Sequence, residues 1–398
     1  MCFNSILVPV NKLTDIQKKN LRISFVTSGH YPYDDRIFYH QGITLADYGF
    51  QVQIISAKTN LISSDSGIEL NSFDGSLISK REKIKKSIEI LRQFYPDVII
   101  CSEPLPVVAA RLFKRRAGKH VRIIYDITEW YPSKKNFSDK KGIRKYSYFI
   151  RLLLFNLLSS SLTDAFIFGE YYKSRPYRIL FPFKPFIYLT YYPGLNYIDY
   201  RQPGLVPGKL NLSYSGKISR EKGFINFIGV INRLSAIYKD LKIYVKITGW
   251  LESDEDKKEC EVLLKNENAN INLIVEGKQS FNSYVKNLYD TDIFLDLRED
   301  DHENQYCLPI RLFYYAASGR PVIFSDLKAI RKEVEIEKFG FLVKPGETEM
   351  IVRLISKYLE NDDLYYSHCH EARILAETKY NWGKIRSEFV KFVGLTNK

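Results

Sequence analysis

The stretch YCLPIRLFYYAASGRPVI, residues 306–323, decides the fold more than any other part of the chain. Pro309 suits the first turn of a helix, where its missing N–H group is no loss. Gly319 suits the left-handed position just beyond the last turn. The two residues together predict a helix over 309–318.

The start of this helix is a candidate phosphate site. Its free amide groups, near Cys307, Leu308 and Ile310, would donate hydrogen bonds and carry the positive end of the helix dipole. A well-capped crossover helix without a ligand explains the same residues equally well.

A second motif, YSGKISREKG at residues 214–223, follows the first strand predicted for the second half of the chain. Gly216 lets the backbone approach a ligand closely, and Lys217 and Lys222 each supply a positive charge to a diphosphate. A basic loop alone is usually solvated surface, but beside the helix start it predicts a diphosphate site.

Around these motifs, short apolar runs alternate with amphipathic stretches, as in parallel strands joined by helices. In the first half we expect strands at 22–27, 52–56, 98–101, 123–126 and 165–168, and helices at 36–48, 81–94, 105–118 and 140–163. In the second half we expect strands at 210–214, 243–248, 271–275, 293–297, 321–323 and 340–343, and helices at 222–238, 254–266, 280–289, 309–318 and 347–360. The fold class is therefore α/β, with two facing doubly wound, Rossmann-like sheets and a ligand cleft at the carboxyl ends of their strands.

The chain is long enough for two domains, because 398 residues exceed the roughly 100–200 of a typical domain. Proline and glycine concentrate in YYPGLN and RQPGLVPG, which places the boundary near 193–208. The expected parts are an N-terminal extension at 1–20, domains at 21–195 and 205–375, and a last segment at 376–398.

Positive charge is concentrated in the first half. Residues 1–200 carry 29 Lys and Arg against 17 Asp and Glu, whereas residues 201–398 carry 30 against 29. The excess positive charge of the first half favours a polyanionic partner, although net charge also simply keeps a protein soluble. No nucleic-acid-binding motif is present, so anionic lipid and phosphate-bearing substrates are the expected partners.

Cysteine spacing and hydropathy exclude several classes of protein. The five cysteines are widely spaced and include no Cys-x-x-Cys pair, which argues against a disulfide framework or a structural zinc site and favours a reducing cytosol. No apolar run approaches the roughly 20 residues of a membrane-spanning helix, and the start of the sequence shows no secretory signal. Asp300, Asp301 and Glu303 are interpreted as a solvated loop, so no metal site is expected.

Four motifs, in the right order, resemble glycosyltransferase family 4 and its relatives. They are the glycine-lysine turn of 214–223, the Pro-x-Arg-Leu-Phe…Gly-x-Pro-Val-Ile run of 309–323, HYPYDDRIF at 30–38 and YDITEWYP at 125–132. The likeness spans about residues 21–375, and the segment after Tyr380 resembles the helix that returns to the N-terminal domain in this family. The resemblance implies the GT-B fold, with an N-terminal acceptor domain and a C-terminal donor domain.

The resemblance also implies a UDP- or GDP-sugar as substrate, no cofactor, and a set of site residues. The donor-binding residues would be Ser28, Gly29, Gly216, Lys217, Lys222, Gly249, Gly277, Tyr306, Cys307, Leu308, Pro309 and Tyr314. The catalytic residues would be Lys217, Lys222, Thr128 and Asp126, and the acceptor side would be lined by His30, Asp34, Arg36 and Glu129. Lysines and helix amides can stabilise a departing nucleoside diphosphate without a metal ion.

Three positions depart from the family pattern. The paired glutamates of the family, eight positions apart, fall on Tyr306 and Tyr314, and a phenol offers one neutral hydrogen-bonding group in place of a carboxylate. The family's active-site histidine falls on Thr128. These departures leave open a catalytically degenerate subunit that binds a partner or a glycan.

A basic segment precedes the apolar stretch YSYFIRLLLFNLL at 146–158. Its membrane-surface candidates are Lys140, Lys141, Arg144 and Lys145. A helix with a basic flank and an apolar face can lie in a membrane interface, but a buried helix explains the same leucines. We expect both uses, with the leucines inside and the cationic rim outside, extended by the aromatic and basic residues of 171–192.

The sequence thus predicts a retaining, metal-independent glycosyltransferase that moves a hexose-type sugar from a nucleoside diphosphate to a glycan. A lipid-linked acceptor in surface polysaccharide or glycoconjugate assembly would explain the basic domain. The expected location is the cytoplasm, peripherally on the cytoplasmic face of the membrane.

Overall fold

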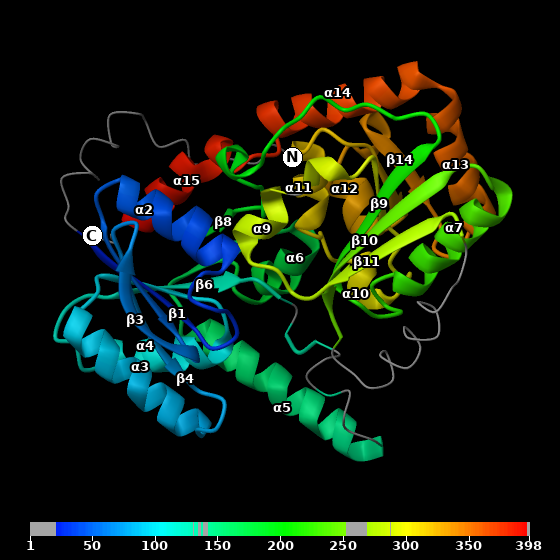
Figure 1. The fold of residues 1–398 in the computed structure, drawn as a ribbon. Helices are drawn as coiled ribbons and strands as arrows, with labels where there is room; N and C mark the ends of the chain where they lie inside the picture. The colour runs from blue at the N-terminus through cyan, green and yellow to red at the C-terminus, as the bar shows by residue number, and fades with distance from the viewer. Residues whose placement is uncertain are drawn as a thin grey trace. The chain divides into compact units, whose positions relative to one another are not determined.

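The computed structural model describes residues 21–129, 131–133, 137, 142–251, 269–286 and 288–395. The chain divides into two compact units, residues 1–190 with 385–398 and residues 191–384, and each unit is built on one sheet covered by helices (Figure 1). The predicted extension at 1–20, the predicted helix at 254–266, Lys140 and Lys141 lie outside the described residues.

Unit 1 contains an eight-stranded sheet in the order β3-β4-β2-β1-β5-β6-β7-β8. The strands are β1 Arg22–Thr27, β2 Gln51–Ser56, β3 Lys58–Asp65, β4 Ile68–Asp74, β5 Val98–Cys101, β6 Arg122–Ile127, β7 Ala165–Phe168 and β8 Phe186–Tyr188. All neighbours pair in parallel except β3 and β4, which form an antiparallel pair. The sequence did not reveal β3, because this edge strand is mostly exposed and lacks the apolar run of a buried strand.

The helices of unit 1 cover this sheet. They are η1 Asp35–Gly42, α2 Ile43–Asp47, α3 Lys80–Phe94, α4 Pro104–Lys114, α5 Gly142–Ser161 and α6 Tyr171–Leu180. The predicted helix over 36–48 is thus two segments, and the first is a wide π-type helix that begins at the cap Asp34. Ser79 and Glu82 form a capping box on α3, which explains why that helix starts where the sequence predicts.

The last helix, α15 Trp382–Gly394, ends in unit 1. Arg122 Nη1 donates to the carbonyl oxygens of Phe392 and Leu395, the latter at 2.9 Å. The Arg122 guanidinium also lies 4.8 Å from the centre of the Phe392 ring. The buried Arg122 guanidinium thus donates hydrogen bonds to carbonyl oxygens at the end of α15 that no backbone N–H of the helix reaches. These contacts hold the end of α15 against β6.

Unit 2 contains a six-stranded, all-parallel sheet in the order β11-β10-β9-β12-β13-β14. The strands are β9 Lys209–Lys217, β10 Lys242–Trp250, β11 Ile271–Glu276, β12 Ile293–Asp296, β13 Val322–Ser325 and β14 Gly340–Val343. The helices are η3 Leu195–Tyr197, α7 Phe224–Ile237, α9 Phe281–Lys286, η4 Leu288–Asp290, α10 His302–Gln305, α11 Arg311–Ala317, α12 Lys328–Glu333, η5 Ile336–Lys338, α13 Thr348–Glu360 and α14 Asp362–Thr378.

Two boundaries in unit 2 differ from the sequence prediction. Strand β9 continues to Lys217, so Gly216 and Lys217 end the strand and do not lie in the turn after it. Helix α11 begins at Arg311, two residues after Pro309, and has seven residues. A macrodipole that short is weak, so the positive potential near this helix has to come mainly from side chains.

Candidate functional site

The carboxyl ends of β9, β10 and β12 meet at one edge of the unit 2 sheet, because the strands are parallel. Gly216 (φ +107°) pairs with Gly249 across β9 and β10, and a Cβ on Gly249 would lie 2.0 Å from the Gly216 carbonyl oxygen. Only glycine fits this contact. The predicted donor residues Gly216, Lys217 and Gly249 are therefore brought together at the edge where open α/β sheets bind ligands.

At the end of β12, one buried carboxylate lies between two guanidinium groups. Arg298 donates from Nε and Nη2 to the Asp296 oxygens at 2.8 and 2.7 Å, and Arg311 Nη2 lies 3.4 Å from Asp296 Oδ2. Burial raises the pKa of Asp296, but the charges of Arg298 and Arg311 outweigh burial and lower it. The carboxylate therefore stays ionised and holds both cations in place.

Lys222 joins this group. Its Nζ donates to Asn304 Oδ1 at 2.9 Å, and the Asn304 amide is fixed by the carbonyl oxygens of Glu221 and Glu299 at 2.9 and 3.0 Å. Burial and the positive charges of Arg298 and Arg311 lower the pKa of Lys222. We call Lys222, Arg298 and Arg311 the cation cluster; with Asp296 as the carboxylate at its centre, the four side chains carry net positive charge.

The turn that carries Lys222 is locked against the end of β12. Gly223 adopts φ +82°, and a Cβ there would lie 2.2 Å from the Leu297 carbonyl carbon. The Tyr214 hydroxyl donates to the carbonyl oxygens of Lys217 and Lys222, at 2.6 and 3.2 Å. These contacts hold the REKG part of the sequence motif in the position that brings Lys222 to the cation cluster.

The other predicted donor residues of unit 2 are more scattered. Tyr314 is 2% exposed and packs in the core against Phe281 and Tyr284. Tyr306 is half-buried and its hydroxyl accepts from Lys328 Nζ at 3.2 Å. Leu308 and Pro309 are buried, Cys307 is half-buried, and Gly277 lies exposed beyond β11 with open space around it.

Sequence reasoning missed four residues of this site: Asp296, Arg298, Asn304 and Arg311. Arg311 lies within residues 306–323, at the position where the family has lysine. The family motif could therefore have pointed to it as a site residue. Asp296 and Arg298 lie in a segment that stands out in the sequence only for its clustered acidic residues. Asn304 has no sequence signal, because its role depends on carbonyl groups from two other segments.

In unit 1, the predicted Ser28–Gly29 turn is built around a residue that the sequence did not single out. Glu103, just before α4, accepts hydrogen bonds from Thr27 Oγ1, Ser28 N and Gly29 N at 2.7, 2.8 and 3.0 Å. A Cβ on Gly29 would lie 2.7 Å from Glu103 Oε1. The carboxylate thus takes the place that a side chain at position 29 would fill.

His30 lies between two carboxylates at the same turn. Its Nδ1 is 2.8 Å from Asp34 Oδ2 and its Nε2 is 3.6 Å from Glu103 Oε1. Burial lowers the pKa of His30, but the hydrogen bond to Asp34 and the charges of Asp34, Glu103 and Glu129 outweigh burial and raise it to about 10. The ring is therefore a cation at neutral pH, and Glu129 is exposed nearby.

Asp126 and Arg36 were predicted as catalytic and acceptor-binding residues, but the structure buries both. Arg36 donates to both oxygens of Asp126 at 2.8 and 2.9 Å, and Gln41 Nε2 donates to the same carboxylate at 2.8 Å. Arg36 is 5% and Asp126 1% exposed. Thr128, at the next turn, is half-buried and accepts a hydrogen bond from Lys173 Nζ at its carbonyl oxygen, at 2.8 Å. The Asp126 carboxylate is thus bound within the protein.

Helix α5 places its side chains differently from the prediction. Arg144 and Lys145 are exposed as expected, but the inward positions include Asn156 as well as Leu152. Asn156 bonds the hydroxyls of Tyr125 and Tyr177. The expectation that the leucines lie inside is wrong for part of the helix, since an apolar stripe faces outward: Ile143, Tyr146, Ile150, Leu154 and Leu158 are exposed.

In the part of the chain that the structure describes, no helix combines the length and hydropathy needed to cross a membrane. Within the same described ranges, no three His, Cys, Asp or Glu side chains gather as candidate metal ligands.

Comparison with known proteins identifies the second unit. The family described as "Glycosyl transferases group 1" matches residues 199–374. No curated protein sequence matches the chain significantly. Among solved structures, sucrose-phosphate synthase from Thermosynechococcus elongatus superposes with a TM-score of 0.70 at 14% identity, over 94% of this chain and 98% of that one.

Two further structures agree in fold. HepE of Anabaena in complex with UDP-glucose has a TM-score of 0.66 at 12% identity, over 94% of this chain and 99% of that one. WaaG, a glycosyltransferase involved in lipopolysaccharide biosynthesis, has a TM-score of 0.65 at 13% identity, over 93% and 99%. The predicted α/β GT-B fold is confirmed. The chain carries a glycosyltransferase group 1 domain, and the predicted enzyme class, glycosyltransferase, is confirmed.

Proposed function

We propose that the chain transfers a sugar from a UDP- or GDP-sugar to a glycan acceptor, and that the cation cluster binds the donor diphosphate. The observation that carries this proposal is the excess of cations over the one buried carboxylate at the carboxyl edge of the unit 2 sheet. A departing nucleoside diphosphate needs stabilisation of its negative charge. HepE, similar in fold, has been solved with UDP-glucose.

The cluster assigns roles to individual residues. Lys222 and Arg311 are less tied to Asp296 than Arg298 is, so they would contact the phosphates, with Lys217 at the strand end beside them. The glycine pair at 216 and 249 would let the backbone approach the ligand. These cations support the proposed metal independence, because they would supply the charge that a divalent ion supplies elsewhere.

Other parts of the proposal rest on the resemblance to glycosyltransferase family 4, which also implies retention of anomeric configuration. His30, Asp34 and Glu129 would then lie on the acceptor side. The exposed apolar stripe of α5, flanked by Arg144 and Lys145, supports a lipid-linked acceptor at the anionic, cytoplasmic face of a membrane. The products would enter surface polysaccharide or glycoconjugate assembly.

The central test is nucleotide binding by Lys222→Ala and Arg311→Gln. Thermal shift and calorimetry with UDP, GDP and their sugars should show binding by the unaltered chain and a loss of about tenfold or more in both variants, because a charge-assisted contact is worth roughly 1.5–3 kcal/mol. Lys239→Ala, an exposed lysine of unit 2, is the matched control and should bind normally. Normal binding by both variants would contradict the proposed site.

A second function, a degenerate subunit that binds a partner or glycan, is favoured by the placement of Tyr314. This residue stands where the family has a glutamate, and it lies in the core. The two functions differ in turnover: a transferase hydrolyses its donor slowly in the absence of acceptor, and the degenerate subunit does not. Hydrolysis of one sugar nucleotide that persists in EDTA would support a metal-independent transferase.

A further inference from the structure

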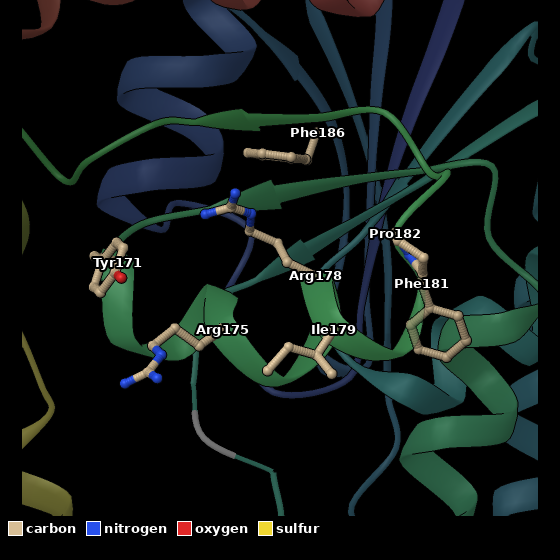
Figure 2. Close-up of a pocket in the computed structure, with 7 residues that line it drawn as sticks. All are labelled: Tyr171, Arg175, Arg178, Ile179, Phe181, Pro182 and Phe186. Atoms are coloured by element: carbon tan, nitrogen blue, oxygen red, sulfur yellow. The ribbon is translucent and has the colours of Figure 1, made fainter. Parts of the chain in front are cut away.

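A hollow of about 370 Å³ in unit 1 lies within the aromatic and basic segment of residues 171–192 and includes none of the predicted donor or acceptor residues (Figure 2). It is lined by α6, the residues after it and the edge strand β8. The lining residues are Tyr171, Arg175, Arg178, Ile179, Phe181, Pro182 and Phe186. None of these seven described residues is acidic, so the hollow is positively charged and otherwise mostly apolar.

The hollow has two chemically different ends. Figure 2 shows the guanidinium groups of Arg175 and Arg178 on the side of Tyr171, with Ile179 and Phe181 on the other side. The Arg178 guanidinium lies 4.9 Å from the centre of the Phe186 ring and donates to the Tyr188 hydroxyl at 3.2 Å. Arg175 is exposed and makes no hydrogen bond or ion pair with any residue in the described ranges.

The apolar end continues into an exposed apolar surface. Ile179 is 72% and Phe183 98% exposed, although both are large and apolar. Lys184 Nζ donates to the carbonyl oxygens of Ser160 and Ser161, each at 2.8 Å, which fastens this segment to the end of α5. The rim of the hollow therefore adjoins the helix that carries the outward apolar stripe.

We propose that this hollow binds the phosphate of an anionic bilayer lipid. The phosphate lies between Arg175 and Arg178, where charge-assisted hydrogen bonds are available. Ile179 and Phe183 enter the boundary between headgroups and acyl chains, as apolar and aromatic side chains do at membrane surfaces. A free phosphate would use only the charged end, so the apolar end selects a lipid. The proposal deepens the membrane part of the proposed function and rests on it.

The test is co-sedimentation of the full chain with vesicles of phosphatidylcholine and phosphatidylglycerol in equal parts, and with phosphatidylcholine alone. The unaltered chain should bind the anionic vesicles preferentially. Arg175→Gln should weaken that binding about fivefold, which corresponds to about 1 kcal/mol for one basic residue near an anionic surface. Phe183→Ser should also weaken it. Arg81→Gln, which removes the same charge from an exposed position on α3, is the matched control and should bind nearly as the unaltered chain does.

Three outcomes would overturn the proposal. Equal weakening by Arg175→Gln and Arg81→Gln would mean general attraction of a basic domain. Displacement of the chain from vesicles by inorganic phosphate, at constant ionic strength, would mean a small-anion site. Normal binding by Arg175→Gln and Phe183→Ser, together with loss in Leu154→Ser on α5, would leave the membrane function standing and exclude the hollow. A chain that binds no vesicle at all would contradict both, while nucleotide binding tests the donor site separately.

Discussion

Arg36 closes on Asp126 in unit 1 with two parallel hydrogen bonds, at 2.8 Å from Nε to Oδ2 and at 2.9 Å from Nη2 to Oδ1. The pair joins the π-type helix η1 to strand β6, and Gln41 adds a third hydrogen bond to the same carboxylate. A carboxylate held in this way positions the loop that carries His30 and Asp34, and the side chain itself has no exposed oxygen to offer a substrate.

Asp126→Asn is therefore expected to lower the free energy of unfolding by about 3–5 kcal/mol, because it leaves the buried Arg36 cation without its counter-charge. Urea unfolding measures the change. Asp47→Asn, an exposed acid on α2, is the control and should stay within about 0.5 kcal/mol of the unaltered chain. Lost activity with unchanged stability would instead make Asp126 a catalytic residue.

Gly223→Ala is expected to destabilise unit 2 strongly and to abolish donor binding, because the new Cβ would overlap the backbone of Leu297. Gly346→Ala is a matched control: Gly346 has nearly the same positive φ, +81°, but nothing lies within 4 Å of the added Cβ. Gly346→Ala should lower the free energy of unfolding by only about 1–2 kcal/mol, which is the strain of a left-handed backbone conformation in a residue with a Cβ. Similar unfolding midpoints for the two variants would show that the turn can relax and is not locked.

The raised pKa of His30 predicts a pH-dependent stability. The folded-state pKa of about 10 lies above the ordinary 6.5, so the charged ring stabilises the fold fully below pH 6.5, and this stabilisation is lost as the pH rises towards about 10. Unfolding of His30→Gln should lack that decline. NMR titration gives the pKa directly, and Asp34→Asn should lower it. A ring that titrates near 6.5 in the unaltered chain would contradict the carboxylate arrangement.

Replacing each tyrosine by the glutamate of the family pattern should affect stability differently at positions 306 and 314. Tyr314→Glu is expected to cost several kcal/mol, because it places a carboxyl group in a core position that is 2% exposed. Tyr306→Glu should be tolerated, since that side chain is half-buried and already bonds Lys328. Urea unfolding of the two variants measures the difference. Increased donor hydrolysis by a stable Tyr314→Glu variant would show instead that position 314 reaches the ligand.

Much of the fold was predictable, because buried parallel strands are continuous apolar runs. β5 and β7 are four-residue strands in which every side chain is buried, and both lie at the residues that the pattern indicated. Strands β3, β4 and β8 were missed: the side chains of the edge strands β3 and β8 are largely exposed, and β4 mixes buried with exposed positions. Helix α6 was missed as well, because its aromatic and basic composition was interpreted as surface.

The site was only partly predictable. Lys222 was identified because a glycine-bounded turn after a strand is a local pattern. Arg298 was not identified, because it looks like ordinary surface charge until Asp296 lies beside it, whereas Arg311 was missed although it stands where the family has lysine. Tyr314 was placed at the ligand by the resemblance to glycosyltransferase family 4, and its burial depends on packing around α11 that no local pattern records.

The sequence by itself determined the α/β class, the order of the apolar strands and the positions of the glycine turns, because these depend on local periodicity and backbone freedom. Only the tertiary structure decided which polar and charged groups meet. Arg36 with Asp126, Glu103 with the Ser28–Gly29 turn, and Lys222 with Asn304 lie 90, 75 and 82 residues apart along the chain. Such pairs form where parallel strands bring their carboxyl ends to one edge, and no local pattern records that geometry.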